Sequence, residues 1–161
     1  MKLKSIITVV LLLFVASSVV MLVSKELSSS PGESPAAAAS LPDNALVVYY
    51  FHGNIRCPTC ESIESYSHDA ITTTFDEELA SDAVVWQVVN YELPENAHFA
   101  TEYELVSPTV VLVRTADGKV ADWQNLVRVW ELVGDREAFT EYVVAETRNM
   151  LAPSSSCHPG I

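Results

Sequence analysis

The sequence predicts an α/β domain with a mixed four-stranded sheet and helices on both faces. Two apolar, β-branched segments, 45–51 and 83–91, flank a stretch with helical spacing, and such a crossover calls for parallel strands. Two further strand-like segments, 109–114 and 119–126, are joined by residues that include Asp-Gly, which is typical of a hairpin and hence of an antiparallel pair. With a closing helix, the predicted order is β-α-β-α-β-β-α.

The first strand and its helix are the clearest elements. Residues 45–51, ALVVYYF, form a continuous apolar run, which indicates a strand buried on both faces. Residues 58–79 then show helical spacing, and Pro58 suits a first helical turn because its missing N–H costs nothing there. One side of this helix carries Cys60, Ile63, Ser67, Ala70 and Ile71.

The remaining elements follow at short intervals. Residues 83–91, AVVWQVVNY, predict a second buried strand, and 95–105 predict a short helix. Residues 135–151 are amphipathic, with Asp135 as a candidate N-cap of the closing helix. The tryptophans are expected in the core or at the sheet edge; they are Trp86, Trp123 and Trp130.

The N-terminus carries an export or anchoring signal. Residues 6–23 are 18 residues without a charge, near the lower limit for a membrane-spanning helix. Lys2 and Lys4 precede them, which places the N-terminus in the cytoplasm and the rest outside. Small residues at 16–18 leave a cleaved signal peptide as the alternative. We expect a single-pass anchor within 1–23 and an extracytoplasmic or periplasmic domain, or a secreted one after cleavage.

Composition divides the remaining chain. Residues 24–43 are rich in Ser, Pro and Ala and predict a flexible linker, because they cannot bury enough apolar surface to offset ordering. The folded domain is expected over 44–152 and a disordered tail over 153–161. The formal net charge is −12, with 21 acidic and 9 basic residues, which argues against nucleic-acid binding.

The segment CPTC places Cys57 and Cys60 around Pro58 and Thr59. Cys57 would lie at a helix N-terminus, where free N–H groups and the helix dipole lower a thiol pKa, and Arg56 adds a cation. Cys60, one turn later and facing inward, would be the resolving thiol in thiol–disulfide exchange. A purely structural disulfide is the alternative, but so short a loop would stabilise the fold little.

Metal binding is a further alternative for the same cysteines. Cys157 and His158 in the tail could join them in a site with three sulfurs and one nitrogen, which suits a copper or zinc chaperone. The acidic Glu61 and Glu64 are expected on a solvated helix face, with Glu64 paired to His68 at i,i+4.

The motifs CPTC and SPTVVLV, in this element order, resemble the thioredoxin-like family over residues 44–151. The resemblance implies a thioredoxin-like fold and a thiol–disulfide oxidoreductase whose redox-active disulfide needs no other cofactor or metal. Its partners would be protein thiols or disulfides. It also implies a cis peptide before Pro108 and a substrate-presenting segment made of Ser107, Pro108 and Thr109.

The sequence departs from the family at two positions. Thioredoxins carry a buried Asp before the first cysteine, but residues 44–56 hold no carboxylate, and His52 is a candidate replacement for proton handling. Arg56 stands where the family usually has Trp. More narrowly, residues 49–66 resemble bacterial proteins described as nitrophenyl compound nitroreductase subunits, which implies an electron-transfer subunit that works with a partner. The direction of electron flow stays open.

Overall fold

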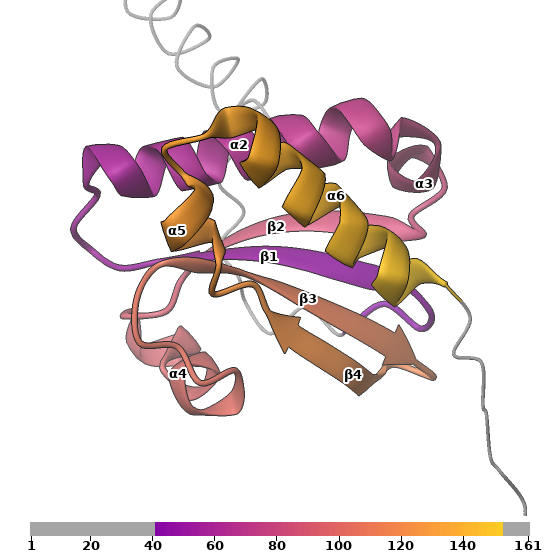
Figure 1. Cartoon of the computed structure of the whole chain (residues 1–161). Coiled ribbons are helices and arrows are strands. Elements are labelled where there is room, and N and C mark those ends of the chain that lie inside the picture. Colours follow the sequence, from indigo (N-terminus) through magenta and orange to yellow (C-terminus); the bar gives the residue numbers. More distant parts are fainter. Residues whose placement is uncertain (1–40, 153–161) are drawn as a thin grey trace, which may run out of the picture. The chain divides into compact units, whose positions relative to one another are not determined.

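The computed structural model describes residues 41–152, shown in colour in Figure 1. The predicted anchor 1–23, nearly all of the linker, and the tail 153–161 lie outside the described residues. Within 41–152, no helix has the length and apolar character that crossing a bilayer requires. The elements are, in order, β1 (Leu46–His52), α2 (Pro58–Thr74), α3 (Asp76–Ala80), β2 (Val84–Asn90), η1 (Pro94–Asn96), α4 (His98–Glu102), β3 (Thr109–Ala116), β4 (Lys119–Asn125), α5 (Val129–Leu132) and α6 (Arg136–Leu151).

The four strands form one sheet in the order β2-β1-β3-β4. Strand β2 runs parallel to β1, while β3 is antiparallel to β1 and β4 is antiparallel to β3. The predicted mixed sheet is therefore confirmed. Because the crossover from β1 to β2 passes through α2 and α3, the start of α2 lies at the carboxyl end of β1 (Figure 1).

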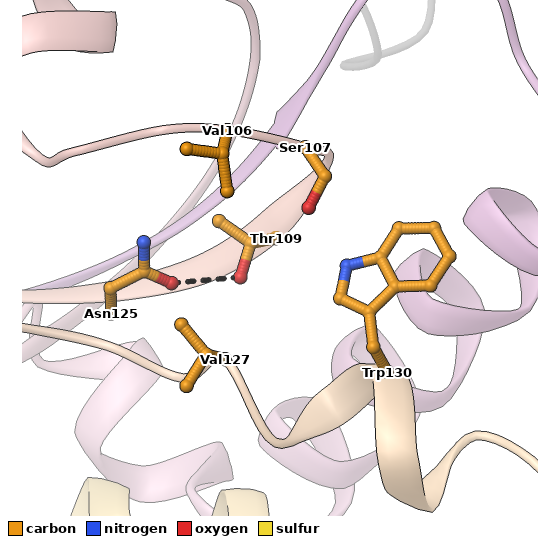
Figure 2. A pocket seen from close by; sticks show the side chains of 6 residues that line it. All are labelled: Val106, Ser107, Thr109, Asn125, Val127 and Trp130. Atoms are coloured by element: carbon orange, nitrogen blue, oxygen red, sulfur yellow. Dashed lines mark hydrogen bonds between the residues drawn. The ribbon is translucent and has the colours of Figure 1, made fainter.

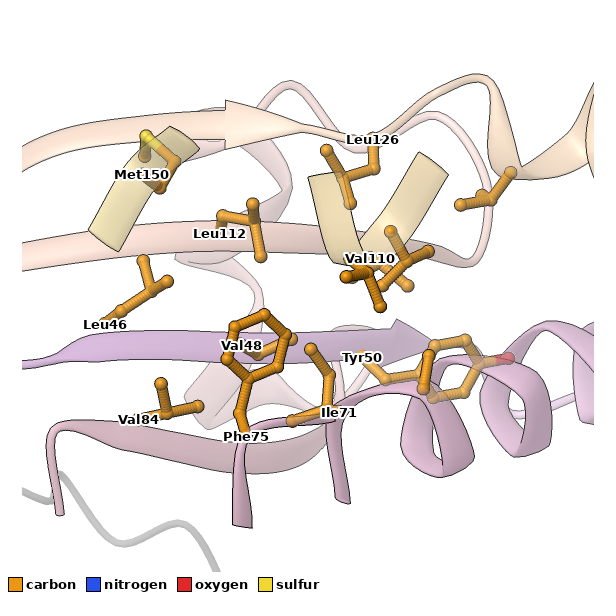
Figure 3. Packing of buried hydrophobic residues seen from close by; sticks show 14 of the residues in the cluster. Leu46, Val48, Tyr50, Ile71, Phe75, Val84, Val110, Leu112, Leu126 and Met150 are labelled. Carbon is orange, nitrogen blue, oxygen red and sulfur yellow. The ribbon is translucent and has the colours of Figure 1, made fainter. Parts of the chain in front are cut away.

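Both faces of the sheet are covered, as predicted. Strand β1 is central, and its side chains alternate between two apolar clusters. One cluster, which includes Leu46, Val48 and Tyr50, packs against α2 and α6, and Figure 3 shows Met150 at one end and Tyr50 at the other. The second cluster lies on the opposite face with α4 and includes Val47, Tyr49, Phe51 and Tyr103.

The structure corrects three expectations about the elements. The helix expected over 58–79 is two helices, because Phe75 leaves helical geometry and buries its ring in the core after three threonines of low helix propensity. The helix expected over 95–105 is a 3₁₀ turn followed by α4, and Glu104 takes a positive φ. The short helix α5 (Val129–Leu132) was not predicted.

A further correction concerns the strand expected to be buried at 83–91. Strand β2 is an edge strand, and most of its side chains are partly exposed. Apolar composition alone does not distinguish a central strand from an edge strand, because that difference depends on how many neighbours the strand has in the sheet.

Candidate functional site

The two cysteines lie at the start of α2, as predicted. Cys57 is the N-cap residue with an extended backbone, and Pro58 occupies the first turn. Cys57 and Cys60 form a disulfide with their Cα atoms 5.0 Å apart. The backbone N–H of Cys60 also donates to the Cys57 sulfur at 3.1 Å. The Cys57 sulfur therefore receives an N–H group that the helix leaves unpaired, which favours a negative charge on that atom.

The two sulfurs differ in their exposure. Cys57 is partly exposed, whereas Cys60 is only 4 % exposed and belongs to the buried side of α2. An attacking partner therefore has access to Cys57 before Cys60. The roles expected from the sequence, with Cys57 attacking and Cys60 resolving, stay a prediction.

A buried tyrosine lies beneath the second cysteine, and sequence reasoning missed it. The Tyr50 hydroxyl donates a 2.7 Å hydrogen bond to the Cys60 carbonyl oxygen. Burial raises the pKa of Tyr50 to about 12, with Glu64 adding to the rise. His52, the candidate for proton handling, stacks near the Tyr50 ring and places Nδ1 2.8 Å from the Gly53 carbonyl oxygen.

Arg56 does not extend freely toward solvent. Its guanidinium forms an ion pair with Glu64 on α2 and lies 6.0 Å from the centroid of the Tyr50 ring. The expected Glu64–His68 pair is thus wrong. The His68 ring packs edge-on against Trp86 instead. Trp86 lies on β2, and helical i,i+4 spacing cannot predict a contact with another element.

The loop that leads to Cys57 is tied to the loop after β2. The Glu92 carboxylate accepts from the Asn54 backbone N–H at 2.8 Å, and the Asn90 side-chain amide donates to the Asn54 side chain at 2.9 Å. A Cβ atom on Gly53 would lie 2.7 Å from Glu92 Oε1. Glycine at this position therefore permits the close approach of the two loops.

The segment Ser107, Pro108 and Thr109 lies at the same end of the sheet as the cysteines. Thr109 pairs with Phe51 of β1, directly before the loop to Cys57. The cis peptide implied before Pro108 is wrong, since residues 41–152 contain no cis bond; the trans form is the preferred state of X–Pro bonds. Thr109 is buried, and its hydroxyl donates to Asn125 Oδ1 at 2.9 Å.

A pocket opens beside this segment (Figure 2). It is lined by Val106, Ser107, Thr109, Asn125, Val127 and Trp130. The Trp130 indole donates from Nε1 to the Pro108 carbonyl oxygen at 2.8 Å while 36 % of the residue stays exposed. Trp86 and Trp123 pack against the two apolar clusters as expected. Trp130 does not, because it lies on the unpredicted helix α5 at the pocket rim.

The metal alternative draws no support from the described part of the chain. Residues 41–152 hold no group of three His, Cys, Asp or Glu side chains suited to a metal ion. Cys157 and His158 lie outside the described residues, and the preceding helix α6 ends at the end of the sheet opposite Cys57 (Figure 1).

Two solved structures resemble this chain. A thioredoxin from Fasciola hepatica is 24% identical, with a TM-score of 0.36 over 62% of this chain and 83% of its own. A thioredoxin from Thermus thermophilus is 23% identical, with a TM-score of 0.34 over 51% of this chain and 58% of its own. No protein-family model and no curated protein matches the sequence.

Both TM-scores lie below 0.5, so the fold assignment rests on the chain's own topology. The narrower resemblance to nitroreductase subunits gains no support from these comparisons. By its strand order, its strand directions and the C-x-x-C disulfide at the start of the helix that follows β1, this chain has a thioredoxin-like fold.

Proposed function

We propose that this domain is a thiol–disulfide oxidoreductase that exchanges its Cys57–Cys60 disulfide with the cysteines of partner proteins. The observation that carries the proposal is the disulfide itself, formed across the first turn of α2 with one sulfur accessible and one buried. A bridge over two residues adds little stability, so a structural role would explain it poorly.

The exchange needs only the two sulfurs. In the oxidising direction, a partner thiolate attacks Cys57 Sγ, forms a mixed disulfide and releases Cys60 as a thiolate, which then takes up a proton. A second thiolate of the same partner then attacks the partner's sulfur in the mixed disulfide. This closes the partner's own disulfide and releases Cys57 as a thiolate. Two electrons pass to the pair, and the partner loses two protons. The reverse sequence reduces a partner disulfide.

The surroundings of the site favour a protein partner over a small thiol. Apolar side chains are exposed at the same end of the sheet: Val106 is 92 % exposed, and Ile55 and Val127 are exposed as well. Together with the pocket beside Ser107 and Pro108, they offer apolar surface to an extended chain that carries a cysteine. Ser107 and Pro108 remain our candidates for presenting that chain.

The domain is proposed to act outside the cytoplasm, held by the N-terminal segment. The uncharged run 6–23 behind Lys2 and Lys4 supports this. The point at which the chain enters the domain bears on the tether alone: the Asp43 carbonyl accepts from the Gly118 N–H in the β3–β4 turn, at the end of the sheet opposite Cys57. A tether attached there would leave the cysteines accessible.

The reduction potential tests the function. The full chain, held in detergent micelles, is equilibrated with glutathione buffers at pH 7, and free thiols are then alkylated. Trypsin releases Cys57–Arg114 separately from Cys157, so the mass of this peptide reports the pair alone. We expect a reversible two-electron couple between about −270 and −120 mV, the range from thioredoxin to strong oxidants. Absence of a reversible couple would contradict the proposal.

Location is tested separately. Alkaline phosphatase, a reporter that folds only outside the cytoplasm, is fused after residue 43 and expressed in a bacterial host. We expect active enzyme that stays with the membranes after a carbonate wash. Active enzyme in the soluble fraction would indicate signal cleavage instead, and inactive enzyme would contradict export.

A further inference from the structure

An ion pair lies across the first two turns of α2. Arg56 directly precedes Cys57, and Glu64 follows Cys57 by seven residues, yet the Arg56 guanidinium reaches the Glu64 carboxylate. Only 35 % of the Arg56 side chain and 24 % of the Glu64 side chain are exposed, so water screens the pair less than a fully solvated one. The pair therefore holds the cation that is nearest to Cys57 in the sequence.

The same cation lies over the buried tyrosine. The Arg56 guanidinium carbon is 6.0 Å from the centre of the Tyr50 ring, whose hydroxyl binds the Cys60 carbonyl. Tyr50 itself is neutral at physiological pH, because the ordinary tyrosine pKa of 10.0 already lies far above that pH and burial raises the pKa of Tyr50 further, to about 12. The charged groups near Tyr50, whose hydroxyl binds the turn that carries Cys60, are therefore Arg56 and Glu64, with Glu61 exposed on the first turn of α2.

We infer that Glu64 sets the reduction potential of the Cys57–Cys60 pair by holding and neutralising Arg56. The inference rests on the proposed function and addresses the direction of electron flow. The oxidised pair carries no charge, whereas the reduced pair carries a thiolate on Cys57 when that thiol ionises. A free Arg56 would favour the reduced form and raise the potential. Glu64 opposes this, so the intact ion pair keeps the potential lower.

Glu64 is suited to this role because His68, the nearest basic side chain along α2, does not pair with it. His68, its i,i+4 neighbour on α2, packs against Trp86 instead. Within residues 41–152, Glu64 forms an ion pair with Arg56 and with no other cation. Glu64 is therefore a positioning residue, which acts on the cysteines through Arg56.

Removing the negative charge of Glu64 in one variant and the positive charge of Arg56 in another tests the inference. The potentials of Glu64→Gln and Arg56→Gln full-length chains are measured in glutathione buffers at pH 7. Glu64→Gln should shift the redox equilibrium about threefold toward the reduced form, which is about +15 mV for a two-electron couple. Arg56→Gln should shift it by a similar factor the other way. A merely structural pair would move both variants in the same direction.

Two further carboxylates serve as matched controls. Glu77→Gln removes an equal charge from α3, at the far end of α2 from the cysteines (Figure 1), and should leave the potential unchanged. Glu61→Gln removes a charge from the first turn of α2 without touching Arg56. Its shift should be the same with or without Arg56→Gln, whereas the Glu64→Gln shift should shrink by at least half when combined with Arg56→Gln.

The failures of the two proposals are distinguishable. Loss of any reversible couple in the unaltered chain overturns the proposed function. A normal couple in the unaltered chain, with Glu64→Gln and Arg56→Gln shifting together or not at all, overturns only the role of Glu64. An undiminished Glu64→Gln shift in the Arg56→Gln background also overturns it, since Glu64 would then act on the thiolate directly.

Discussion

The Tyr50 hydroxyl donates a hydrogen bond of 2.7 Å to the Cys60 carbonyl oxygen, ten residues along the chain. Tyr50 belongs to β1 and Cys60 to the first turn of α2, so this bond fixes the helix start onto the central strand. Both groups are buried, and a lost bond would not be replaced by water without opening the core. The bond joins the central strand directly to the helix turn that carries the Cys57–Cys60 disulfide.

Replacing Tyr50 by Phe should lower the free energy of unfolding by about 1 kcal/mol, the usual net value of one buried hydrogen bond. Urea unfolding at pH 7 measures it. Tyr66→Phe is the matched control, because Tyr66 is partly exposed and packs its ring against Phe139, and it should change the unfolding free energy by less than about 0.5 kcal/mol. Equal losses in both variants would show that the Tyr50 bond is energetically unimportant.

Tyr50 and its neighbour Tyr49 should make the folded domain less stable at alkaline pH. The pKa values of Tyr49 and Tyr50 rise from 10.0 to about 12 in the folded protein, chiefly through burial. Between these values the unfolded chain binds fewer protons than the folded one, so stability falls as pH rises. The urea midpoint should be flat up to about pH 10 and then decline toward pH 12. Tyr50→Phe should decline less steeply, and an equal decline would contradict the assignment to Tyr50.

The two cysteines should react in a fixed order. In the reduced protein, Cys57 should react with iodoacetamide at least tenfold faster than Cys60, because Cys60 is buried and Cys57 accepts an N–H from the helix start. Cys60→Ser should therefore accumulate mixed disulfides with partner proteins, and Cys57→Ser should not. Non-reducing gels followed by mass spectrometry measure this. Mixed disulfides that form mainly through Cys60 would reverse the proposed roles.

Substituting Gly53 should loosen the loop that leads to Cys57. In Gly53→Ala, the new methyl group would lie 2.7 Å from Glu92 Oε1. The other oxygen of that carboxylate, Oε2, accepts from the Asn54 N–H, so either the loop or the Glu92 side chain must move. We expect a loss of about 1–2 kcal/mol in the free energy of unfolding.

Gly134→Ala is the control for the glycine substitution, since nothing lies within 4 Å of its added Cβ, and it should be neutral or slightly stabilising. Adding Glu92→Ala to Gly53→Ala should recover part of the loss by removing the clash. If the double variant were as unstable as the sum of the two single variants, steric contact with Glu92 would not be the cause.

The pocket rim should influence exchange with peptides more than exchange with small thiols. Trp130→Ala removes the indole that lines the pocket and bonds the Pro108 carbonyl, so reduction by a cysteine-containing peptide should slow about threefold, or about 0.7 kcal/mol. Reduction by glutathione should change little. Stopped-flow kinetics measure both rates. Equal slowing with both reductants would place the effect on the disulfide and not on the pocket.

Much of the fold was predictable because it follows from patterns that involve only neighbouring residues. The continuous apolar run of β1, the Asp-Gly turn before β4 and the proline after Cys57 each act within a few residues. They were enough to predict the sheet, the order of its strands in the chain and the position of the C-x-x-C at a helix start. The edge position of β2 was not predictable, because apolar composition does not show how many neighbouring strands a strand has in the sheet.

The details of the site were decided by the tertiary structure. Tyr50 meets Cys60, Arg56 meets Glu64, and Trp130 meets Pro108 across 22 residues, and no periodicity relates these partners. The Tyr50–Cys60 contact joins β1 to α2, the Arg56–Glu64 contact joins the loop before α2 to the helix itself, and the Trp130–Pro108 contact joins α5 to the segment before β3. The sequence alone determined which residues can carry the chemistry. Only packing decided which charges and hydrogen bonds surround them, since those depend on how separate elements and loops lie against one another in space.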